Sequence, residues 1–509
     1  MNYKLVEPIK NSEGGFMYYN SPEKEGVKSW TLEGNEVYYV RELENESAKF
    51  KKLAPLLERN PCKFFISLGE KLKSYLNKIN YQTAAYQTLD EKLYIMVDYT
   101  DPRPLYGLAI ADGEDWDKKE DLLYIAFNTE WDSIEDGEFE EIFAHEYFHL
   151  WLYLLNYSPK NHRSNKFHTV TAVTDPYTAF SEGFAEHLEP VSYQNGLEDV
   201  AQEKFSGFWD HAIDINAFLC KRDTQLRYFA VRNNRFIYNK MIPEIGQYSD
   251  FITLHLDYIS STAFLPERVK NGSQIIASEG AIATVFYQIY KHDTFKNNFL
   301  DDDFYNRFDT EKKEVSPLEN LYLKMLYVMS QQDYINTTYP MIDFIKRYGE
   351  NFPEEKEDLY KLFLETTHFT TVSTRASKLF SDFYLAGRRA EIEEFKRELG
   401  QIRDFKADLL EKVIRGEIEL DQGLYPQIWV ENLTYQIPPC PWMRDRLENY
   451  IFDLNTASIA DLMSLTRLDH GKARKLIKIR EENRGFSSFT EFEKLTTGLI
   501  DVDLKELDN

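Results

Sequence analysis

Alternating apolar and polar positions predict a group of strands in the N-terminal part of the chain. The strand-like runs span residues 36–43, 92–99, 105–110 and 122–127. An amphipathic helical pattern covers residues 63–79, between the first two runs. After the last run, Ser133 and the acidic stretch 135–141 open a long helical segment, and negative charge is favourable near a helix N-terminus. The pattern therefore predicts strands that lead into one long helix.

Helical periodicity dominates from Pro190 to about Pro441 and predicts a helical region of two packed units. Prolines interrupt it near positions 243, 266, 317, 340 and 353. A proline-rich stretch at 437–442 indicates a linker or a rigid turn before a final segment of about 60 residues. We expect this last segment to be an independent small module.

Composition indicates a folded protein of several domains. With 509 residues, of which 43% are hydrophobic, the chain is long enough for two to four domains with real interiors. The formal charge of −25 argues against a generic binder of polyanions, because such a field repels nucleic acid and acidic membrane surfaces. Only a local basic patch would restore DNA binding.

Cysteine usage and the N-terminal sequence predict a cytoplasmic protein. Cys62, Cys220 and Cys440 are isolated, which fits a reducing compartment and excludes a disulfide framework or a zinc site built from cysteines. Residues 1–10 lack a signal-peptide pattern, and no segment is apolar enough over about 18 residues to span a membrane. We therefore expect no membrane association.

One short motif predicts a metal site. Residues 145–149 read His-Glu-Tyr-Phe-His, so His145 and His149 lie four apart on one helical face, where two imidazoles bind a single zinc ion. A catalytic zinc needs a third protein ligand and an open position, and Glu146 is placed to act as general base and acid. The alternative is an amphipathic helix with structural histidines, which the uncharged positions around the motif disfavour.

A second acidic segment supplies the third ligand. In the sequence 178–187, Thr-Ala-Phe-Ser-Glu-Gly-Phe-Ala-Glu-His, we assign this role to Glu182 and expect Thr178 or Ser181 to cap its helix. Glu186, one turn later, is placed to accept the second ring N–H of a zinc-bound histidine. The alternative is a solvated acidic helix face.

The two motifs together resemble those of the gluzincin metallopeptidases, especially the aminopeptidase-N-type enzymes, over about residues 90–300. The resemblance implies zinc at His145, His149 and Glu182, with Glu146 as general base and acid. It also implies that a small sheet precedes the active-site helix and that strand 122–127 lines the substrate cleft.

Three departures from the family limit this inference. The connection from 156 to 176 is longer than in the family and is expected to form a loop over the cleft, and the family's amine-binding strand is absent. Ala277 stands where those enzymes carry a transition-state tyrosine, so no residue is assigned to stabilise the oxyanion. His168, Tyr177 and His187 are candidates only because they lie nearby in the sequence.

The C-terminal segment, over residues 453–499, resembles the helix-hairpin-helix module of competence-protein type DNA receptors. Ser458 is expected to cap a short helix, and the predicted core consists of Leu462, Leu465, Ala473, Ile477 and Phe492. Arg467 and Asp469 replace the hairpin glycines that approach phosphate in DNA-binding members. Basic residues nevertheless outnumber acidic ones over 467–484. We favour protein docking or intramolecular packing over DNA binding for this module.

These observations predict a mostly helical α+β protein with four parts. They are an N-terminal α/β region of unknown role (1–85), a zincin-like catalytic domain with a small N-terminal sheet (86–300), a helical domain (301–448) and an all-α helix-hairpin-helix module (449–509). The predicted function is that of an intracellular zinc metallopeptidase acting on peptides or proteins, with the module recruiting substrate or a protein partner. The alternatives are a DNA-associated protease, a zinc scaffold with altered catalysis, and a zinc hydrolase of other amides or of epoxides.

Overall fold

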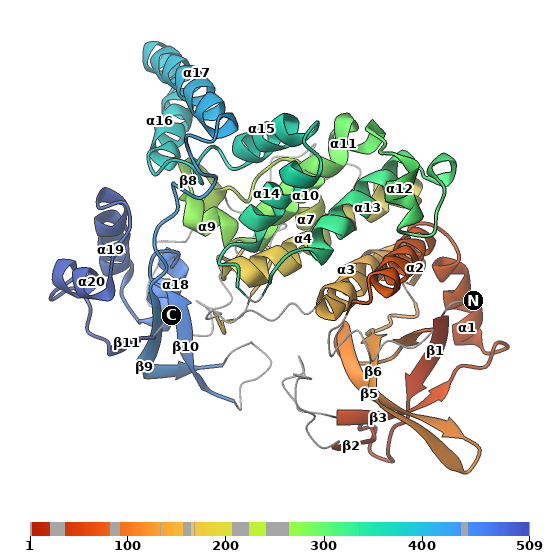
Figure 1. The fold of residues 1–509 in the computed structure, drawn as a ribbon. Coiled ribbons are helices and arrows are strands. Elements are labelled where there is room, and N and C mark those ends of the chain that lie inside the picture. Colours follow the sequence, from red (N-terminus) through yellow and green to blue (C-terminus); the bar gives the residue numbers. More distant parts are fainter. Residues whose placement is uncertain are drawn as a thin grey trace. The chain divides into compact units, whose positions relative to one another are not determined.

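The protein forms two compact units in the computed structural model (Figure 1). One comprises residues 1–158, 188–206 and 296–334, and the other comprises residues 159–187, 207–295 and 335–509. The residues that the structure describes are 3–20, 36–81, 92–132, 134–155, 164–166, 168–205, 223–240, 264–334, 336–438 and 446–507.

A six-stranded sheet organises the first unit, with the strand order β1-β4-β6-β5-β3-β2. Its strands are β1 (Tyr3–Pro8), β2 (Tyr18–Asn20), β3 (Glu36–Glu42), β4 (Leu93–Met96), β5 (Arg103–Asp112) and β6 (Asp115–Ala126). The four strands that the hydrophobic pattern predicts are present as β3 to β6. Because β1 pairs with both β3 and β4, the strands before residue 85 belong to the same sheet as those after it. The predicted domain boundary at residue 85 thus falls between strands of one sheet.

Helix α3 (Glu138–Leu154) packs on this sheet and on helix α2 (Cys62–Lys78). A Cβ atom on Gly69 of α2 would overlap the Tyr147 hydroxyl and the Trp151 ring of α3, so the glycine permits a close approach of the two helices. The other helical elements of this unit are α1 (Ala48–Leu57), η2 (Ile134–Asp136), α5 (Glu198–Phe205), α12 (Asp302–Asn306), η3 (Lys312–Glu314) and α13 (Pro317–Ser330).

Helices make up most of the described part of the second unit. Before its C-terminal part they are α7 (Asp223–Arg232), α9 (Gly272–Ile276), α10 (Glu279–Lys291), α14 (Pro340–Asn351), α15 (Lys356–Thr366), α16 (Ala376–Arg389) and α17 (Ile392–Ile414). Helices α4 (Pro176–Tyr193) and α11 (Asp293–Asn297) contribute residues to both units. Pro317 and Pro340 are each the first residue of a helix, where a missing N–H costs nothing.

A short antiparallel pair of strands, β7 (Tyr238–Lys240) and β8 (Phe264–Val269), lies within the region in which helical periodicity predominates. Pro266 lies within β8. Position 243 is outside the described residues.

The C-terminal part combines a three-stranded sheet with three short helices. The strands are β9 (Trp429–Ile437), β10 (Glu448–Asp453) and β11 (Leu504–Glu506), and the helices are α18 (Ile459–Leu465), α19 (His470–Glu482) and α20 (Phe489–Leu495). All five predicted core residues lie in or against one apolar cluster. Because β9 is the central strand of this sheet, the module includes residues before the predicted boundary at 449. Most of the predicted proline-rich linker at 437–442 lies outside the described residues, because residues 439–445 are not described.

The fold is thus α+β, with a small N-terminal sheet, a helical region and a C-terminal module that contains strands as well as helices. The structure therefore corrects the prediction of an all-α module. Among the described residues, no helix has the length and apolar character needed to cross a membrane.

Candidate metal centre

Helix α3 is buried on most of its surface and accessible along one stripe. Glu138 is exposed and Ile142, His145 and His149 are half-buried, whereas most positions between them are buried. This spacing of three and four residues is that of one helical face. The first and last positions of the predicted metal motif therefore lie on the accessible face, while Glu146, beside them, is 8% exposed.

Buried polar contacts fix the N-terminal end of α3. Glu140 forms an ion pair with Arg59 at 2.8 Å, and Glu141 accepts a 2.5 Å hydrogen bond from the Tyr193 hydroxyl. Burial, followed by the charge of Glu141, raises the pKa of Tyr193, so this phenol stays protonated and donates. Acidic residues in a first turn also interact favourably with the helix dipole. These contacts hold the rotation of α3 about its axis, on which the direction of the two histidines depends.

Helix α4 begins differently from the sequence prediction. The capping residue is Asp175, whose Oδ1 accepts hydrogen bonds from the backbone N–H groups of Tyr177 and Thr178, both at 2.9 Å. Thr178 and Ser181, the predicted caps, lie inside the helix. The reason is Pro176, which occupies the first helical position and moves the cap one residue before it.

Three glutamates follow one face of α4, at positions 182, 186 and 189. Glu182 is half-buried, and Glu186 and Glu189 are 4% exposed. Gly183, next to Glu182, lies so close to α10 that an added Cβ would be 2.8 Å from the Glu279 carbonyl oxygen. The glycine therefore lets α4 pack closely on α10 at the turn that carries Glu182.

Two of the three predicted metal ligands, His145 and His149, offer ring nitrogens that lie close together, whereas Glu182 belongs to the other compact unit. The Nε2 atoms of His145 and His149 are 3.0 Å apart. Tetrahedral zinc with bonds of about 2.0–2.1 Å to nitrogen requires a separation of roughly 3.3 Å between such atoms. The donor types and their spacing therefore fit a zinc ion.

Glu189 is the residue that the sequence argument missed. Its Oε1 is 3.1 Å from Nδ1 of His145, and the side chain of Glu189 is 5% exposed. A carboxylate in this position holds the proton on Nδ1 and leaves Nε2 as a donor for a metal. The sequence predicts this role for Glu186, which lies three residues before Glu189 on α4. The sequence did contain a signal for this role, because Glu189 is an acidic residue that follows Glu182 by seven positions.

The three residues considered for oxyanion stabilisation lie in different environments. His187 is fully buried against Phe184 and Phe286, and burial lowers its pKa to about 3, which marks a neutral core histidine. Tyr177 is 1% exposed. His168 has a side chain that is 46% exposed, and its Nδ1 is 2.9 Å from Oε1 of the buried Glu279. Of the three, only His168 combines an accessible ring with a charged partner.

The charge of His168 follows from its neighbours. Partial burial lowers its pKa, but the negative charges of Glu279 and then Glu182 outweigh this effect and raise the pKa to about 10. Burial in turn raises the pKa of Glu279 to about 7 despite the contact with His168. His168 is therefore a cation at neutral pH, on the side of α4 that carries Glu182.

The C-terminal module shows why its hairpin differs from a phosphate-binding one. Arg467 adopts a left-handed backbone conformation with φ 51°, and its guanidinium stacks on the ring of Tyr435 at 4.3 Å. Asp469 caps α19 by accepting a 2.8 Å hydrogen bond from the Lys472 backbone N–H. A carboxylate thus occupies the helix N-terminus at which a phosphate would bind.

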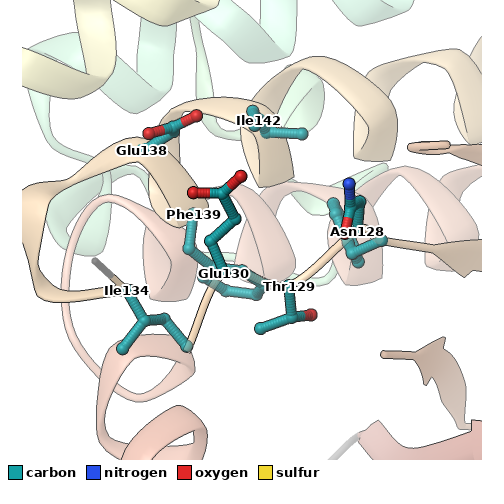
Figure 2. Close-up of a pocket in the computed structure, with 8 residues that line it drawn as sticks. Asn128, Thr129, Glu130, Ile134, Glu138, Phe139 and Ile142 are labelled. Carbon is teal, nitrogen blue, oxygen red and sulfur yellow. The ribbon is translucent and has the colours of Figure 1, made fainter. Parts of the chain in front are cut away.

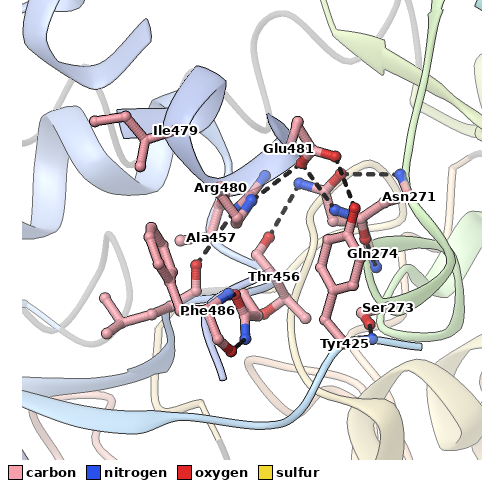
Figure 3. Close-up of polar contacts among 12 residues, drawn as sticks. Asn271, Ser273, Gln274, Tyr425, Thr456, Ala457, Ile479, Arg480, Glu481 and Phe486 are labelled. Carbon is pink, nitrogen blue, oxygen red and sulfur yellow. Dashed lines mark hydrogen bonds and ion pairs between the residues drawn. The ribbon is translucent and has the colours of Figure 1, made fainter. Parts of the chain in front are cut away.

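Polar contacts dock this module on the helical part of its unit (Figure 3). Glu481 of α19 accepts hydrogen bonds from Asn271 at 3.1 Å and from the Tyr425 hydroxyl at 3.0 Å. Gln274 donates to the Thr456 carbonyl at 3.2 Å. These contacts attach the segment to α9 through side chains, although its sequence predicts an independent module.

Within the module, one arginine has a structural role. Arg480, 1% exposed, donates to the Ala457 carbonyl at 2.6 Å and forms an ion pair with Glu481 at 3.1 Å. It is therefore removed from the basic surface that the sequence suggested. The basic residues that remain exposed on α19 are Lys472, Arg474, Lys475 and Lys478.

Comparison with known proteins identifies the module alone. The helix-hairpin-helix motif family matches residues 449–497. No curated protein and no solved structure matches this chain.

Proposed function

We propose that this protein is a zinc-dependent hydrolase and, from the resemblance of its motifs, a metallopeptidase. The observation that carries the proposal is the pair of imidazoles on one face of α3, with the Nε2 atoms of His145 and His149 3.0 Å apart and Glu189 beside Nδ1 of His145. The sequence supplies Glu182 as the third ligand. Two imidazoles and one carboxylate are a ligand set that catalytic zinc sites use, with one position left open.

The surroundings of the three ligands support the same interpretation. Glu189 orients the ring of His145, and buried carboxylates of this kind raise the basicity of metal-binding histidines. Two histidines and a carboxylate are also the residue types that zinc sites use. The alternative, a set of structural histidines, leaves the choice of these residue types unexplained.

Each residue has a defined chemical role in this proposal. Zinc supplies a Lewis acid that polarises the substrate carbonyl and makes water a stronger acid. Glu146 takes the proton of the attacking water and delivers it to the leaving nitrogen. The positive charge of His168 is suited to stabilise negative charge that develops on the substrate oxygen, an effect worth about 2.7–4 kcal/mol in other enzymes.

The test is a peptide-library digestion by the wild-type protein and by the Glu146→Gln variant, with zinc measured in both by mass spectrometry. We expect close to one zinc per chain in each protein and cleavage by the wild type alone. A protein that binds no zinc after supplementation contradicts the whole proposal. Zinc binding without cleavage of any peptide leaves a zinc protein but rejects the peptidase, in which case other amides and epoxides are the next substrates to screen.

A second proposal concerns the C-terminal module, because helix-hairpin-helix motifs commonly bind DNA. The supporting observation is the family match at residues 449–497, together with the exposed basic side chains of α19. Binding through this surface would recruit the hydrolase to proteins on DNA. The carboxylate of Asp469 disfavours the usual phosphate contact and leaves protein docking as the competing role.

Duplex and single-stranded oligonucleotides distinguish these two roles. DNA binding predicts an affinity that falls steeply with salt and is weakened by Lys475→Glu, whereas the exposed Glu493→Gln in α20 leaves it unchanged. No measurable affinity at low salt rejects the DNA-binding role.

A further inference from the structure

The pocket beside the N-terminal half of α3 is too small to bind a substrate side chain (Figure 2). Its volume of about 30 Å³ is enough for water only. In the proposed function, the group that acts on the substrate oxygen is His168. The reaction therefore depends on how the ring of this residue is held.

Burial does not hold the ring of His168. The side chain is 46% exposed, and its Nδ1 lies 2.9 Å from Oε1 of Glu279. Keeping an exposed side chain at one such contact costs conformational entropy. The contact with Glu279 therefore depends on how firmly the backbone on both sides of His168 is attached.

The backbone after His168 is attached to the helical part of the same compact unit. The Gly280 N–H donates to the Val170 carbonyl at 3.0 Å, and the Thr174 N–H donates to the Ala277 carbonyl at 2.7 Å. These bonds connect the segment to the start of α10, the helix that carries the acidic partner of His168. One side of the segment is thus fixed to this helix.

The backbone before His168 is attached to the C-terminal module through Asn165. The side-chain Oδ1 of Asn165 accepts a hydrogen bond from the Ile451 N–H at 2.9 Å, and its Nδ2 donates to the Asn449 carbonyl at 3.0 Å. Both partners belong to β10, which is an edge strand of its described sheet. The amide therefore contacts backbone groups that would otherwise pair with a neighbouring strand.

The adjacent residue, Lys166, forms a second attachment to the module. Its Nζ pairs with Oδ1 of Asp461, and both side chains are buried. The other oxygen of Asp461 accepts a 2.7 Å hydrogen bond from the Ser458 N–H, as part of a capping box at the start of α18. Because the helix end holds this carboxylate, Lys166 is directed at a fixed point of the module.

These attachments lie close enough to His168 to control its position. His168 follows Lys166 by two residues and Asn165 by three, which is at most about 7 Å and about 11 Å of extended chain. Their partners on the module all lie within residues 449–497, the range that matches the helix-hairpin-helix family. The module and the start of α10 thus hold the segment of His168 from opposite sides.

We propose that the C-terminal module positions His168 for the reaction, with Asn165 and Lys166 as the positioning residues. The inference rests on the proposed hydrolase function, because that function gives His168 its role. The module then forms a structural part of the site in addition to any partner that it binds. Without the two attachments, the segment keeps its bonds to α10, but the ring of His168 is free to leave Glu279.

The first test follows the position of His168 without relying on catalysis. Deuterium exchange at C2 of the ring, measured by mass spectrometry on the full-length protein, reports its pKa. We expect this pKa to fall from about 10 towards 6.5 in Asn165→Ala and in Lys166→Met, because the ring no longer stays beside Glu279. His187, whose pKa burial lowers to about 3, shows in the same experiment whether each variant is folded.

The matched control is Tyr425→Phe. It removes the hydrogen bond from the Tyr425 hydroxyl to Glu481, which holds the module without touching the segment of His168. This variant is expected to leave the pKa of His168 unchanged. An equal fall in Tyr425→Phe and Asn165→Ala would mean that any loosening of the module moves the ring, which would overturn the assignment of Asn165 as a positioning residue.

The second test uses the kinetics of a peptide that the wild type cleaves. Asn165→Ala is expected to lower kcat about tenfold and to change KM less than about twofold, whereas His168→Ala is expected to lower kcat roughly 100- to 1000-fold. The double variant Asn165→Ala/His168→Ala is expected to be no slower than His168→Ala, because Asn165 acts through that ring. Additive losses would show a general structural role and would overturn the inference.

The outcomes separate this inference from the proposed function. A pKa of His168 that is the same in the wild type, Asn165→Ala and Lys166→Met overturns the positioning role, whether or not the protein cleaves peptides. A wild-type pKa near 6.5 also overturns it, because the ring is then not held at Glu279. If the wild type binds no zinc or cleaves no peptide, the hydrolase fails, and a fall of the pKa in the variants shows that the module holds His168 for another purpose.

Discussion

At the scale of single residues, the contact between Glu189 and His145 determines which ring nitrogen of His145 is available. The carboxylate lies 3.1 Å from Nδ1, which favours the tautomer with the proton on Nδ1, and Nε2 lies 3.0 Å from Nε2 of His149. We expect Glu189→Gln to weaken zinc binding about 10- to 100-fold, because an amide orients the ring but does not add negative charge. Competition with a chelator of known affinity measures this change.

The matched control is Asp199→Asn, which removes one exposed carboxylate from the nearby helix α5. It is expected to leave zinc affinity unchanged. Equal effects of the two variants would mean that net charge, and not the contact with His145, controls zinc affinity.

His168 provides a second prediction at this scale. Its folded pKa of about 10 lies above the ordinary 6.5, so the charged ring stabilises the folded state. This contribution is complete below pH 6.5 and is lost as the pH rises through about 10. Histidine C2 hydrogen exchange, followed by mass spectrometry, reports the pKa of each ring. We expect His168 to remain protonated at pH 8 in the wild type.

In Glu279→Gln, which removes the facing charge, the pKa of His168 is expected to fall towards 6.5. His187 is an internal reference, since burial lowers its pKa to about 3. If His168 titrates near 6.5 in the wild type, solvent screens the interaction between His168 and Glu279.

The residues of the candidate site differ in how far sequence could predict them. The positions of His145, Glu146 and His149 follow from helix geometry alone, because their spacing is local. Glu182 lies far from the motif in the sequence, so local helix geometry does not identify it. It was assigned as a ligand from the resemblance to the gluzincin metallopeptidases. Asp175, which replaced the predicted caps, depends on where Pro176 starts the helix, and Glu189 depends on how α4 packs against α3, which no periodicity reveals.

At the scale of elements, the close packing of α2 on α3 positions the metal motif. Gly69 provides the space for Tyr147 and Trp151. We expect Gly69→Ala to lower the free energy of unfolding by about 1–3 kcal/mol, as overpacking typically does. Denaturant titration followed by tryptophan fluorescence measures this loss.

Gly400 is the matched control, because it lies within α17 and has nothing within 4 Å of an added Cβ. There, Gly400→Ala is expected to raise the free energy of unfolding by about 0.5–1 kcal/mol through helix propensity. A loss of stability of the same size at both sites would point to a property of glycine replacement in general and not to the contact between α2 and α3.

Hydrophobic patterning located the elements that are amphipathic over several residues. It found β3 to β6 and α2, because each alternates with the period of its structure. It missed β2, which has three residues, and β8, which lies in a region of helical periodicity. Short strands of this kind depend on their partners, and a local window contains too few positions to show them.

At the scale of the whole molecule, the attachment of the C-terminal module was beyond the reach of the sequence. The proline-rich stretch indicated a boundary, and the core of the module was predicted correctly from its apolar residues. The contacts that fix the module join segments far apart in the chain, such as Gln274 with Thr456. They include polar side chains that a local pattern assigns to the surface.

The strongest of these contacts gives a prediction about the whole chain. Lys166 and Asp461 form a buried ion pair at 2.5 Å, with side chains that are 4% and 7% exposed. Lys166→Met leaves the Asp461 carboxylate buried without a countercharge, which typically costs 3–5 kcal/mol. We therefore expect faster hydrogen exchange in both α18 and the segment 168–175, which carries His168.

Two variants test whether this coupling depends on the ion pair. Lys472→Met removes an exposed lysine of α19 and is expected to leave exchange in both segments unchanged. The double variant Lys166→Met/Asp461→Asn removes both charges and is expected to recover part of the stability, because no uncompensated charge remains buried. If Lys166→Met instead accelerates exchange in α18 alone, the module and the segment that carries His168 are not coupled. A change in the module is then not transmitted to His168 through this ion pair.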